Sequence, residues 1–534
     1  MDSQLRTFDL GVLVVYMAGV FAMGCWFAKR SGSTSEFMAA GRSLPGWVVG
    51  LSIFGTYFSS ISFLGMTGKS FGGNWNSWVF GLSLPIAALV AVRYFVPLYR
   101  GGDSISAYAH LEDRFGPWAR TYALICYLLS QLARMGTILY LVALALAPLT
   151  GWDVKSIILF TGVMVTIYTL LGGIEAVIWT DVVQSIVLVV GVLFCGFLIV
   201  TSLPGGAGQL FEVAREHDKF SLGSFDLGPM AALRTEPTFW IVLVYGFFIN
   251  LQNFGVDQSF VQRYLTAKSD RAAKSSVWMG ALLFPVVSAV LFFVGTGLFA
   301  LYEAKPELLE EVKVQVAETR LIQEGREVNG AAVAEAASGL SAVDVGDKVL
   351  PHFIVNELPM GLAGLLIAAI FAAAMSSMDT SLNSSATLVL CDLYKRYVRP
   401  GAGERESMKV LHSATFVFGV LGTVTAVAMI RVKSALDAWW NLQGIFTGGV
   451  LGLFLLGLIS KRARNAQAIL AVSIGIFLIL WLSLSTTGFW PEAWARWRNP
   501  LHSFLTIVLG TTTIVLVGTL AARWAGRAER RENL

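Results

Sequence analysis

Charged residues are scarce in this chain: they make up 14% of its 534 residues, whereas hydrophobic residues make up 55%. Soluble globular domains carry about 25% charged residues, so the composition excludes that class. The mean hydropathy of +0.66 is typical of a polytopic membrane protein. The longest polar segments, 203–237 and 303–347, are too short for an appended soluble domain. We therefore expect one membrane domain over 1–534.

Cysteine and histidine are also rare. Cys25, Cys126, Cys195 and Cys391 lie in or at the ends of apolar stretches without a pairing pattern, and we interpret them as packing residues. The five histidines lack the spacing of metal ligands. The sequence shows no nucleophile–base pair or complete phosphate-binding loop, which argues against a membrane-embedded enzyme. The net charge of +4 reflects membrane topology and does not indicate nucleic-acid binding.

Apolar stretches of about 18 residues or more can cross ~30 Å of hydrocarbon as helices. The stretches are 8–28, 45–66, 74–99, 119–148, 155–173, 178–202, 238–256, 276–302, 360–390, 408–430, 436–460, 466–486 and 502–522. They predict an all-α polytopic membrane protein with about 13 transmembrane helices. The first stretch is not expected to be a cleaved signal peptide, because Asp2, Arg6 and Asp9 lie before it or at its start and Lys29 and Arg30 follow it.

Lys and Arg residues near the ends of spans stay on the cytoplasmic side of a membrane. If the N-terminus lies outside, many of them fall in inner loops and in the C-terminal tail. They are Lys29, Arg30, Arg42, Arg100, Arg114, Arg120, Arg263, Lys268, Arg271, Lys274, Lys395, Arg396, Arg399, Arg405, Lys409, Lys461, Arg462, Arg464, Arg523, Arg527, Arg530 and Arg531. This predicts a multi-pass plasma-membrane protein, in the inner membrane of a bacterium, with its N-terminus outside and its C-terminus cytoplasmic. The Glu-rich loop 303–347 then faces outward, as a solvated insertion or as a surface helix over the outer mouth.

Two spans are interrupted by glycine and polar residues. Gly55 is followed by a serine-rich run within LPGWVVGLSIFGTYFSSISFLG, and FWIVLVYGFFINLQNFGVDQS carries amides before Gly255. Broken helices at corresponding positions of two halves indicate a midplane site in transporters with inverted repeats. The interrupted spans are five apart, so we predict inverted repeats over 45–202 and 238–460, with 8–28 and 466–522 peripheral.

The segment FAAAMSSMDTSLNSS, residues 371–385, carries a polar stripe. At helical spacing Ser376, Asp379 or Thr380, and Asn383 share one face. The alternative is that the hydroxyls only bond the carbonyl four residues earlier. A carboxylate near mid-membrane costs several kcal/mol unless it faces water, a partner or an ion. Hydroxyl, carbonyl and carboxylate oxygens are suited to a small hard cation.

Two more ionisable residues fall inside or beside apolar spans. Asp181, in GGIEAVIWTDVVQS, is a functional acid or an interfacial partner of a helix dipole. Arg134, in LLSQLARMGTILYL, has no carboxylate three or four residues away. Its guanidinium fork matches a carboxylate. The partner is therefore a substrate, an acid on another helix or a cluster of backbone carbonyls.

Four motifs carry a family resemblance: GRSLPGWVVGLSIFGTYFSSISFLG (41–65), GGIEAVIWTDVVQ (172–184), DQSFVQRYLTAKS (257–269) and AAIFAAAMSSMDTSLNSSATLVLCDLYKRY (368–397). They resemble the sodium:solute symporter family in the same order, and the resemblance covers nearly the whole chain. Within that family the chain is most similar to bacterial sodium-coupled sialic acid transporters. The resemblance implies a LeuT-like 5+5 inverted repeat with broken second and seventh spans, which coincides with the repeats predicted above.

The resemblance also implies one or two sodium ions. The first sodium site would use the carbonyls of Gly55, Phe58 and Ala373 and the hydroxyls of Ser376 and Ser377. A second, deeper site would use Asp181, Asp379 and Thr380, and would share Ser376. Asp379 departs from the family pattern, in which a hydroxyl is usual. A carboxylate there either tightens the sodium site or binds a proton.

By the same resemblance, Ser59, Ser60, Ser62, Arg134 and Asn250 match positions that line the sugar site. Ser77 and Gly81 stand where sialic acid carriers have an aromatic residue and a glutamine. The absence of that aromatic residue and that glutamine removes a polar anchor and enlarges the pocket.

The expected function is sodium-coupled symport of a small organic solute by alternating access, with an acidic sugar such as sialic acid as the leading candidate. The alternatives are symport of a neutral sugar, polyol or monocarboxylate, and, from another class, a passive channel or a solute-responsive membrane module. The expected partners are the solute, sodium and the lipid bilayer. Neither nucleic acid nor an obligate protein partner is predicted.

Overall fold

The computed structural model describes residues 6–102, 104–228, 233, 236–430, 435–487 and 490–532; the side chains at 60–61, 148–149, 323, 435–441 and 526–532 lie outside that description. The α-helices are α1 Thr7–Trp26, α2 Thr34–Ala39, α3 Gly46–Tyr57, α4 Ser60–Gly72, α5 Val79–Leu82, α6 Leu84–Val90, α7 Val96–Arg100, α8 Ala109–Phe115, α9 Pro117–Thr150, α10 Val154–Ser202, α11 Gly206–Glu216, α12 Phe239–Gly255, α13 Gln258–Leu265, α14 Asp270–Ala304, α15 Pro306–Gln323, α16 Gly330–Ser338, α17 Ala342–Asn356, α18 Leu362–Leu388, α19 Glu404–Met429, α20 Ala435–Ile459, α21 Asn465–Leu484 and α22 Leu505–Glu532. The 3₁₀ turn η3 Trp75–Trp78 precedes α5, and the π-helical segments η4 Ala91–Phe95 and η6 Val389–Val398 continue α6 and α18.

The number of membrane crossings agrees with the sequence once α10 is divided. Among the described residues, 10 helices are long and apolar enough to span, or 12 if each bent pair counts as one span. A straight helix of 49 residues would be about 70 Å long, more than twice the hydrocarbon thickness of ~30 Å. Gly173, with φ 58° and ψ −156°, breaks α10 between the predicted spans 155–173 and 178–202. Counted as two, α10 completes the predicted set of about 13.

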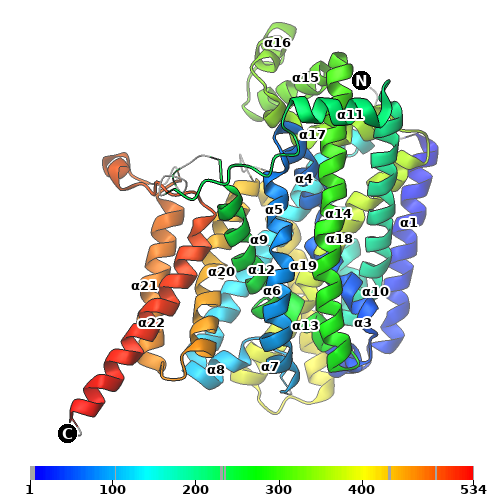
Figure 1. The fold of residues 1–534 in the computed structure, drawn as a ribbon. Helices are drawn as coiled ribbons and strands as arrows, with labels where there is room; N and C mark the ends of the chain where they lie inside the picture. Colours follow the sequence, from blue (N-terminus) through cyan, green and yellow to red (C-terminus); the bar gives the residue numbers. More distant parts are fainter. Residues whose placement is uncertain are drawn as a thin grey trace.

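Figure 1 shows the two chain ends at opposite faces of the helical bundle. The N-terminus lies near α11, α15 and α16, at what we term the upper face, and the C-terminus lies beyond α7 and α8, at the lower face. The predicted loop 303–347 is largely helical, since it contains α15, α16 and the start of α17.

Helix α17 packs directly on α4 through two glycines. A Cβ added at Gly68 would lie 2.8 Å from the carbonyl carbon of Gly346, closer than real side chains approach. The upper end of α4 is further held by Lys219, whose ammonium donates to the carbonyls of Phe71 (2.7 Å) and Gly73 (3.1 Å). Burial lowers the pKa of Lys219 to about 8. The upper half of the second span is thereby fixed to the upper-face helices.

Helix α18 lies at the centre of the bundle. From Leu366 to Leu388 all of its residues are buried, because it packs against α10, α9, α1 and α19. Its first turn is capped from another helix: Asp9 of α1, 1% exposed, accepts the backbone N–H groups of Gly361 (2.6 Å) and Gly364 (2.9 Å). A carboxylate at a helix N-terminus satisfies orphan donors and the helix dipole.

Asp9→Ala is expected to lower the free energy of unfolding by about 1–3 kcal/mol, because two buried N–H groups lose their acceptor. Thermal unfolding of the detergent-purified protein measures the loss. Asp113→Ala is the matched control, because it removes an exposed carboxylate from α8 at the lower face. Equal losses in the two variants would contradict the capping role.

Candidate functional site

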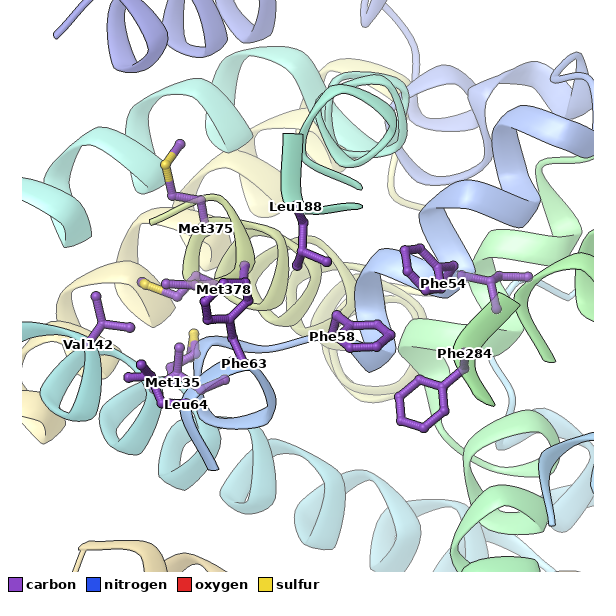
Figure 2. Packing of buried hydrophobic residues seen from close by; sticks show 14 of the residues in the cluster. Phe54, Phe58, Phe63, Leu64, Met135, Val142, Leu188, Phe284, Met375 and Met378 are labelled. Atoms are coloured by element: carbon purple, nitrogen blue, oxygen red, sulfur yellow. The ribbon is translucent and has the colours of Figure 1, made fainter. Parts of the chain in front are cut away.

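The second span is broken where the sequence places its serine-rich run. Helix α3 ends at Tyr57, α4 begins at Ser60, and their axes differ by 54°. Phe58 and Ser59 between them are extended, and the Ser59 hydroxyl caps α4 by accepting the Ser62 N–H at 3.3 Å. The rings of Phe54 and Phe284 each lie 4.8 Å from that of Phe58. Figure 2 shows this packing beside the break; on the other side of the break, the Phe63 ring lies toward Met378 and Leu64 lies beside Met135.

The seventh span is broken in the same way. Helix α12 ends at Gly255, α13 begins at Gln258, and the bend is 52°. Asp257 caps α13 by accepting the Ser259 N–H at 2.8 Å and the Ser259 hydroxyl. Both predicted breaks are therefore confirmed, and α13 extends the seventh span beyond its predicted end at 256.

The backbone before the first break lies against α18, where the first sodium site is predicted. A Cβ added at Gly55 would lie 3.4 Å from the Ser376 hydroxyl and 2.7 Å from that of Ser185. The last carbonyls of α3 lack helical donors because the helix stops. On α18, the Ser377 hydroxyl donates to the Ala373 carbonyl at 3.2 Å. The structure thus brings Gly55 and Ser376, two of the predicted ligands, together, and the roles of Phe58, Ala373 and Ser377 in a sodium site stay predictions.

The polar face of α18 divides into two stripes. Asn383 accepts from Gln262 of α13 at 2.9 Å, whereas Ser381 donates to Gln131 of α9 at 2.7 Å and Ser384 accepts from Tyr127 at 2.7 Å. The alternative of bonding to the carbonyl four residues earlier is also realised. Such bonds are made by the side chains of Ser377, Thr380, Ser381, Ser384 and Thr387.

Asp181 is fully buried and forms an ion pair that the sequence did not predict. Its Oδ2 accepts from Arg263 Nη2 at 2.9 Å and from the Ser52 hydroxyl at 2.5 Å, and its Oδ1 accepts from the Ser376 hydroxyl at 2.5 Å. The alternative of an interfacial helix partner is therefore wrong. Arg263 was predicted to lie in an inner loop, and this too is wrong: it lies in α13 and is 1% exposed.

The Arg263 guanidinium joins four elements. It donates to Asp181 of α10, to Ser52 of α3 (2.8 Å), to the Ser259 carbonyl of α13 (2.8 Å) and to the Thr380 hydroxyl of α18. The prediction failed because a broken span needs more residues to cross the membrane than a straight helix. Acidic and amide residues continue past the predicted end of the span at 256, as far as Gln262. This pattern is the signal in the sequence that the span extends beyond the break.

Asp379 is also fully buried, but its surroundings differ from those of Asp181. Its Oδ2 accepts from the Tyr168 hydroxyl at 2.7 Å and the Thr180 hydroxyl at 3.5 Å, both of α10. Thr380 lies beside it, with its hydroxyl 3.4 Å from Asp379 Oδ1. Tyr168, Thr180 and Ser52 were not among the predicted site residues, because hydroxyl-bearing residues are common in membrane helices.

Arg134 lies on α9 and faces the first break. Its Nη2 donates to the Thr56 carbonyl in the last turn of α3 at 3.2 Å. Among the described residues no carboxylate is within ion-pair distance, although the charge of Asp257 in the second break acts on it. The residue is half-buried, and the bond to Thr56 is the one hydrogen bond that its guanidinium makes to the described residues, so other N–H groups remain for a ligand. Of the three partners considered, a backbone carbonyl is observed and the substrate stays a prediction.

The remaining predicted sugar-site residues are spread over several elements. The Ser59 and Ser62 hydroxyls lie 3.4 Å apart at the start of α4. Asn250 of α12 is fully buried and donates to Ser83 at 2.9 Å, while its Oδ1 has no partner among the described residues. Ser77 is exposed in η3, and Gly81 of α5 faces the Phe284 ring of α14. The side chain of Ser60 lies outside the described residues.

Arg263→Met is expected to lower the free energy of unfolding by about 3–5 kcal/mol, because it leaves the Asp181 carboxylate buried without its cation. Thermal unfolding in detergent measures the loss. The double variant Arg263→Met/Asp181→Leu is the control, since removal of both charges recovers part of the stability. A double variant that loses the sum of the two single effects would contradict the pairing.

Comparisons with known proteins agree on one family. Residues 37–475 match the sodium:solute symporter family. The chain is 32% identical over 525 residues to the sodium/sialic acid symporter SiaT of Proteus mirabilis (strain HI4320), covering 97% of this chain and 96% of that protein. It is 32% identical over 526 residues to the sodium/sialic acid symporter NanT of Aliivibrio fischeri (strain ATCC 700601 / ES114), with coverages of 98% and 94%.

A solved Na⁺-coupled sialic acid symporter, in a substrate-bound outward-open state with a novel Na⁺ site, superposes with a TM-score of 0.83. Its identity to this chain is 30%, covering 97% of this chain and 98% of the other. Mhp1, a nucleobase-cation-symport-1 family transporter in a closed conformation, has a TM-score of 0.51 at 15% identity, a likeness of fold alone. The predicted LeuT-like all-α fold is confirmed. With this fold and with the family match over 37–475, the chain belongs to the sodium:solute symporter family.

Proposed function

We propose that this protein is a sodium-coupled symporter that imports an acidic sugar of the sialic acid class by alternating access. The observation that carries the proposal is Arg134, a half-buried residue whose guanidinium is held at the first helix break by the Thr56 carbonyl and makes no other hydrogen bond to the described residues. The sialic acid symporters that match nearly its whole length support this substrate class.

Sodium binding supplies the coupling step. An ion held by the carbonyls of Gly55, Phe58 and Ala373 and by the hydroxyls of Ser376 and Ser377 joins the end of α3 to α18. The free carbonyls of a broken helix and the fixed hydroxyls of an intact one together replace the hydration shell of the ion. Because the ion holds the break in one geometry, the hydroxyls of Ser59 and Ser62 are placed beside Arg134 for substrate.

The expected driving force is sufficient for uphill uptake. Each positive charge that moves inward gains roughly 2.3 kcal/mol per 100 mV, and a tenfold sodium gradient adds about 1.4 kcal/mol per ion. Two sodium ions carried with one monovalent anion move one net positive charge. Together these contributions allow accumulation of about a thousandfold or more.

The repeat boundaries and the orientation are part of this proposal. Spans over 45–202 and 238–460 form the two inverted repeats, with 8–28 and 466–522 at the periphery. The upper face, with α11, α15 and α16, is the outer face, and the C-terminus is cytoplasmic in the bacterial inner membrane. No nucleic acid or obligate protein partner enters the mechanism, and no chemical change of the solute is proposed.

Ser377→Ala is expected to weaken sodium binding by roughly tenfold, the size of effect seen when a metal site loses a polar contact. The sodium dependence of thermal stability and of uptake measures the change. Ser385→Ala is the matched control, because Ser385 is buried on the same helix and its hydroxyl has no partner among the described residues. Equal effects of the two substitutions would contradict the assignment of Ser377.

Arg134→Ala is expected to abolish uptake of acidic sugars into proteoliposomes, because the substrate carboxylate loses its fork-shaped donor. Arg134→Lys keeps the charge without the fork and should retain part of the activity. The substrates compared are sialic acids, uronic acids, neutral hexoses and monocarboxylates, with and without sodium. Undiminished uptake in Arg134→Ala would exclude its role, and uptake independent of sodium would exclude coupling. Counterflow separates a carrier from a passive channel.

A further inference from the structure

The upper half of the second span, α4, leaves one of its faces uncovered. Ser62, Gly65 and Met66 are half-buried and Lys69 is exposed, and at helical spacing these four residues share one face, which we term the open face of α4. A Cβ added at Gly65 would meet no atom within 4 Å, so open space lies beside it. Helices α17 and α14 pack on the other faces of α4.

The open face leads from the first helix break toward the upper face of the molecule. Ser62 lies in the first turn of α4, with its hydroxyl 3.4 Å from that of Ser59, and both belong with Arg134 to the solute site proposed above. Lys69 lies two turns further along α4, about 10 Å from Ser62. A solute that enters from the upper side therefore passes Lys69 before it reaches Arg134.

Lys69 has charged neighbours on the upper-face helix α17. Gly346 of α17 packs on Gly68 of α4, and it is followed by Asp347, which is exposed, and Lys348, which is half-buried. The Asp347 carboxylate reaches α4, since a Cβ added at Gly68 would lie 2.5 Å from its Oδ1. The charges of Lys348 and Lys69 both act on Asp347. Two cations and one anion thus lie together beside the open face, with one positive charge in excess.

The two lysines are not engaged by other side chains. Neither the Lys69 nor the Lys348 ammonium makes a hydrogen bond or an ion pair with the described residues. Other charges on the upper-face helices are paired, as Arg320 of α15 is with Asp344 of α17 at 3.2 Å. Burial lowers the pKa of Lys348, which means that its charge is incompletely hydrated and gains from a further anion.

We propose that Lys69 and Lys348 form an outer subsite that captures the carboxylate of an acidic solute before it reaches Arg134, while the Asp347 carboxylate competes with that of the solute. A lysine is a flexible, strongly hydrated point charge, whereas an arginine forms a bidentate fork with a carboxylate. Lysines therefore suit a capture step that must release the solute, and Arg134 suits the site that holds it. Charges beside an entry path also raise the association rate of an oppositely charged ligand.

The capture subsite rests on the uptake of an acidic sugar from the upper side proposed above, and it adds the residues that the solute meets first. If Lys69 and Asp347 served only to hold α17 against α4, neutralising either residue would change transport in the same direction. A capture subsite predicts opposite directions, because removing Asp347 removes the competitor for the two lysines.

The test is the initial rate of sodium-driven uptake of N-acetylneuraminate into proteoliposomes that contain the full-length carrier, measured over a range of solute concentrations. Lys69→Gln should raise KM by roughly threefold to fivefold, and Lys69→Gln/Lys348→Gln by about tenfold, with kcat within about twofold of wild type, because an entry charge acts mainly on association. Asp347→Asn should lower KM. Lys69→Arg keeps the charge and should retain the wild-type KM.

Ionic strength provides a second measurement on the same proteins. Choline chloride added at constant sodium should raise the KM of the wild-type protein more than that of Lys69→Gln/Lys348→Gln, because salt screens exposed charges. A purely structural role of the lysines would leave the two salt dependences equal, and this result would contradict the capture subsite. Thermal unfolding of each variant in detergent confirms that it is folded.

Lys313→Gln is the matched control for Lys69→Gln. Lys313 also lies on an upper-face helix, α15, but it is paired with Glu310 of the same helix at 2.8 Å. The substitution makes the same change in net charge and should leave KM unchanged. An equal rise of KM in Lys313→Gln and Lys69→Gln would show a general surface potential and overturn the subsite.

The remaining outcomes separate the subsite from the proposed function. An unchanged KM in Lys69→Gln/Lys348→Gln, or a raised KM in both Asp347→Asn and Lys69→Gln, overturns the capture subsite and leaves the sodium-coupled symport intact. If the wild-type protein shows no sodium-driven uptake of N-acetylneuraminate or of a uronic acid, the proposed function fails, and the capture subsite fails with it.

Discussion

The buried ion pair between Asp181 and Arg263 is the interaction on which the arrangement of this site depends. Two opposite charges in a membrane interior are stable only when every hydrogen-bonding atom around them is satisfied. Here the partners come from α10, α13, α3 and α18, with Ser52, Ser376, Thr380 and the Ser259 carbonyl completing the set. Because Ser52 belongs to α3 and Arg263 to α13, the pair fixes these two half-helices against α10 and α18.

The two breaks follow from ordinary helix chemistry. Ser59 and Asp257 are the N-cap residues of α4 and α13, and each starts a new helix partway through a bent span. The half-helices before them end with carbonyls that accept side-chain donors instead of helical N–H groups: Thr56 accepts from Arg134, and Gly255 accepts from Tyr99. An interrupted helix is costly in lipid, because its backbone groups lack partners there. When protein encloses the interruption, the same backbone groups can bind side chains or ligands.

The sequence predicted a large part of the fold because hydrophobic length and glycine interruption are local signals. These two signals predict both broken spans, the set of membrane-spanning helices and the polar face of α18. Arg263 could not be placed by the same reasoning, because a basic residue seven positions after the predicted end of the span at 256 resembles a topological signal until the bend after α12 adds length to the span. Asp181 posed a similar difficulty, since its partner lies 82 residues away along the chain. Which oxygens surround Asp379 depends on the packing of α10 on α18, which no local pattern encodes.

Five hydroxyls of α18, those of Ser377, Thr380, Ser381, Ser384 and Thr387, donate to the carbonyl one turn earlier, whereas Ser376 donates to Asp181 and the Ser385 hydroxyl has no partner among the described residues. When an ion or solute departs, such a hydroxyl still has a hydrogen-bond acceptor. The empty site therefore contains few unsatisfied donors. The hydroxyl donors of the unloaded carrier therefore need no water molecules as acceptors while the carrier changes conformation and faces the outside again. This redundancy favours rapid turnover, because the empty return step is often what limits how many molecules a transporter moves per second.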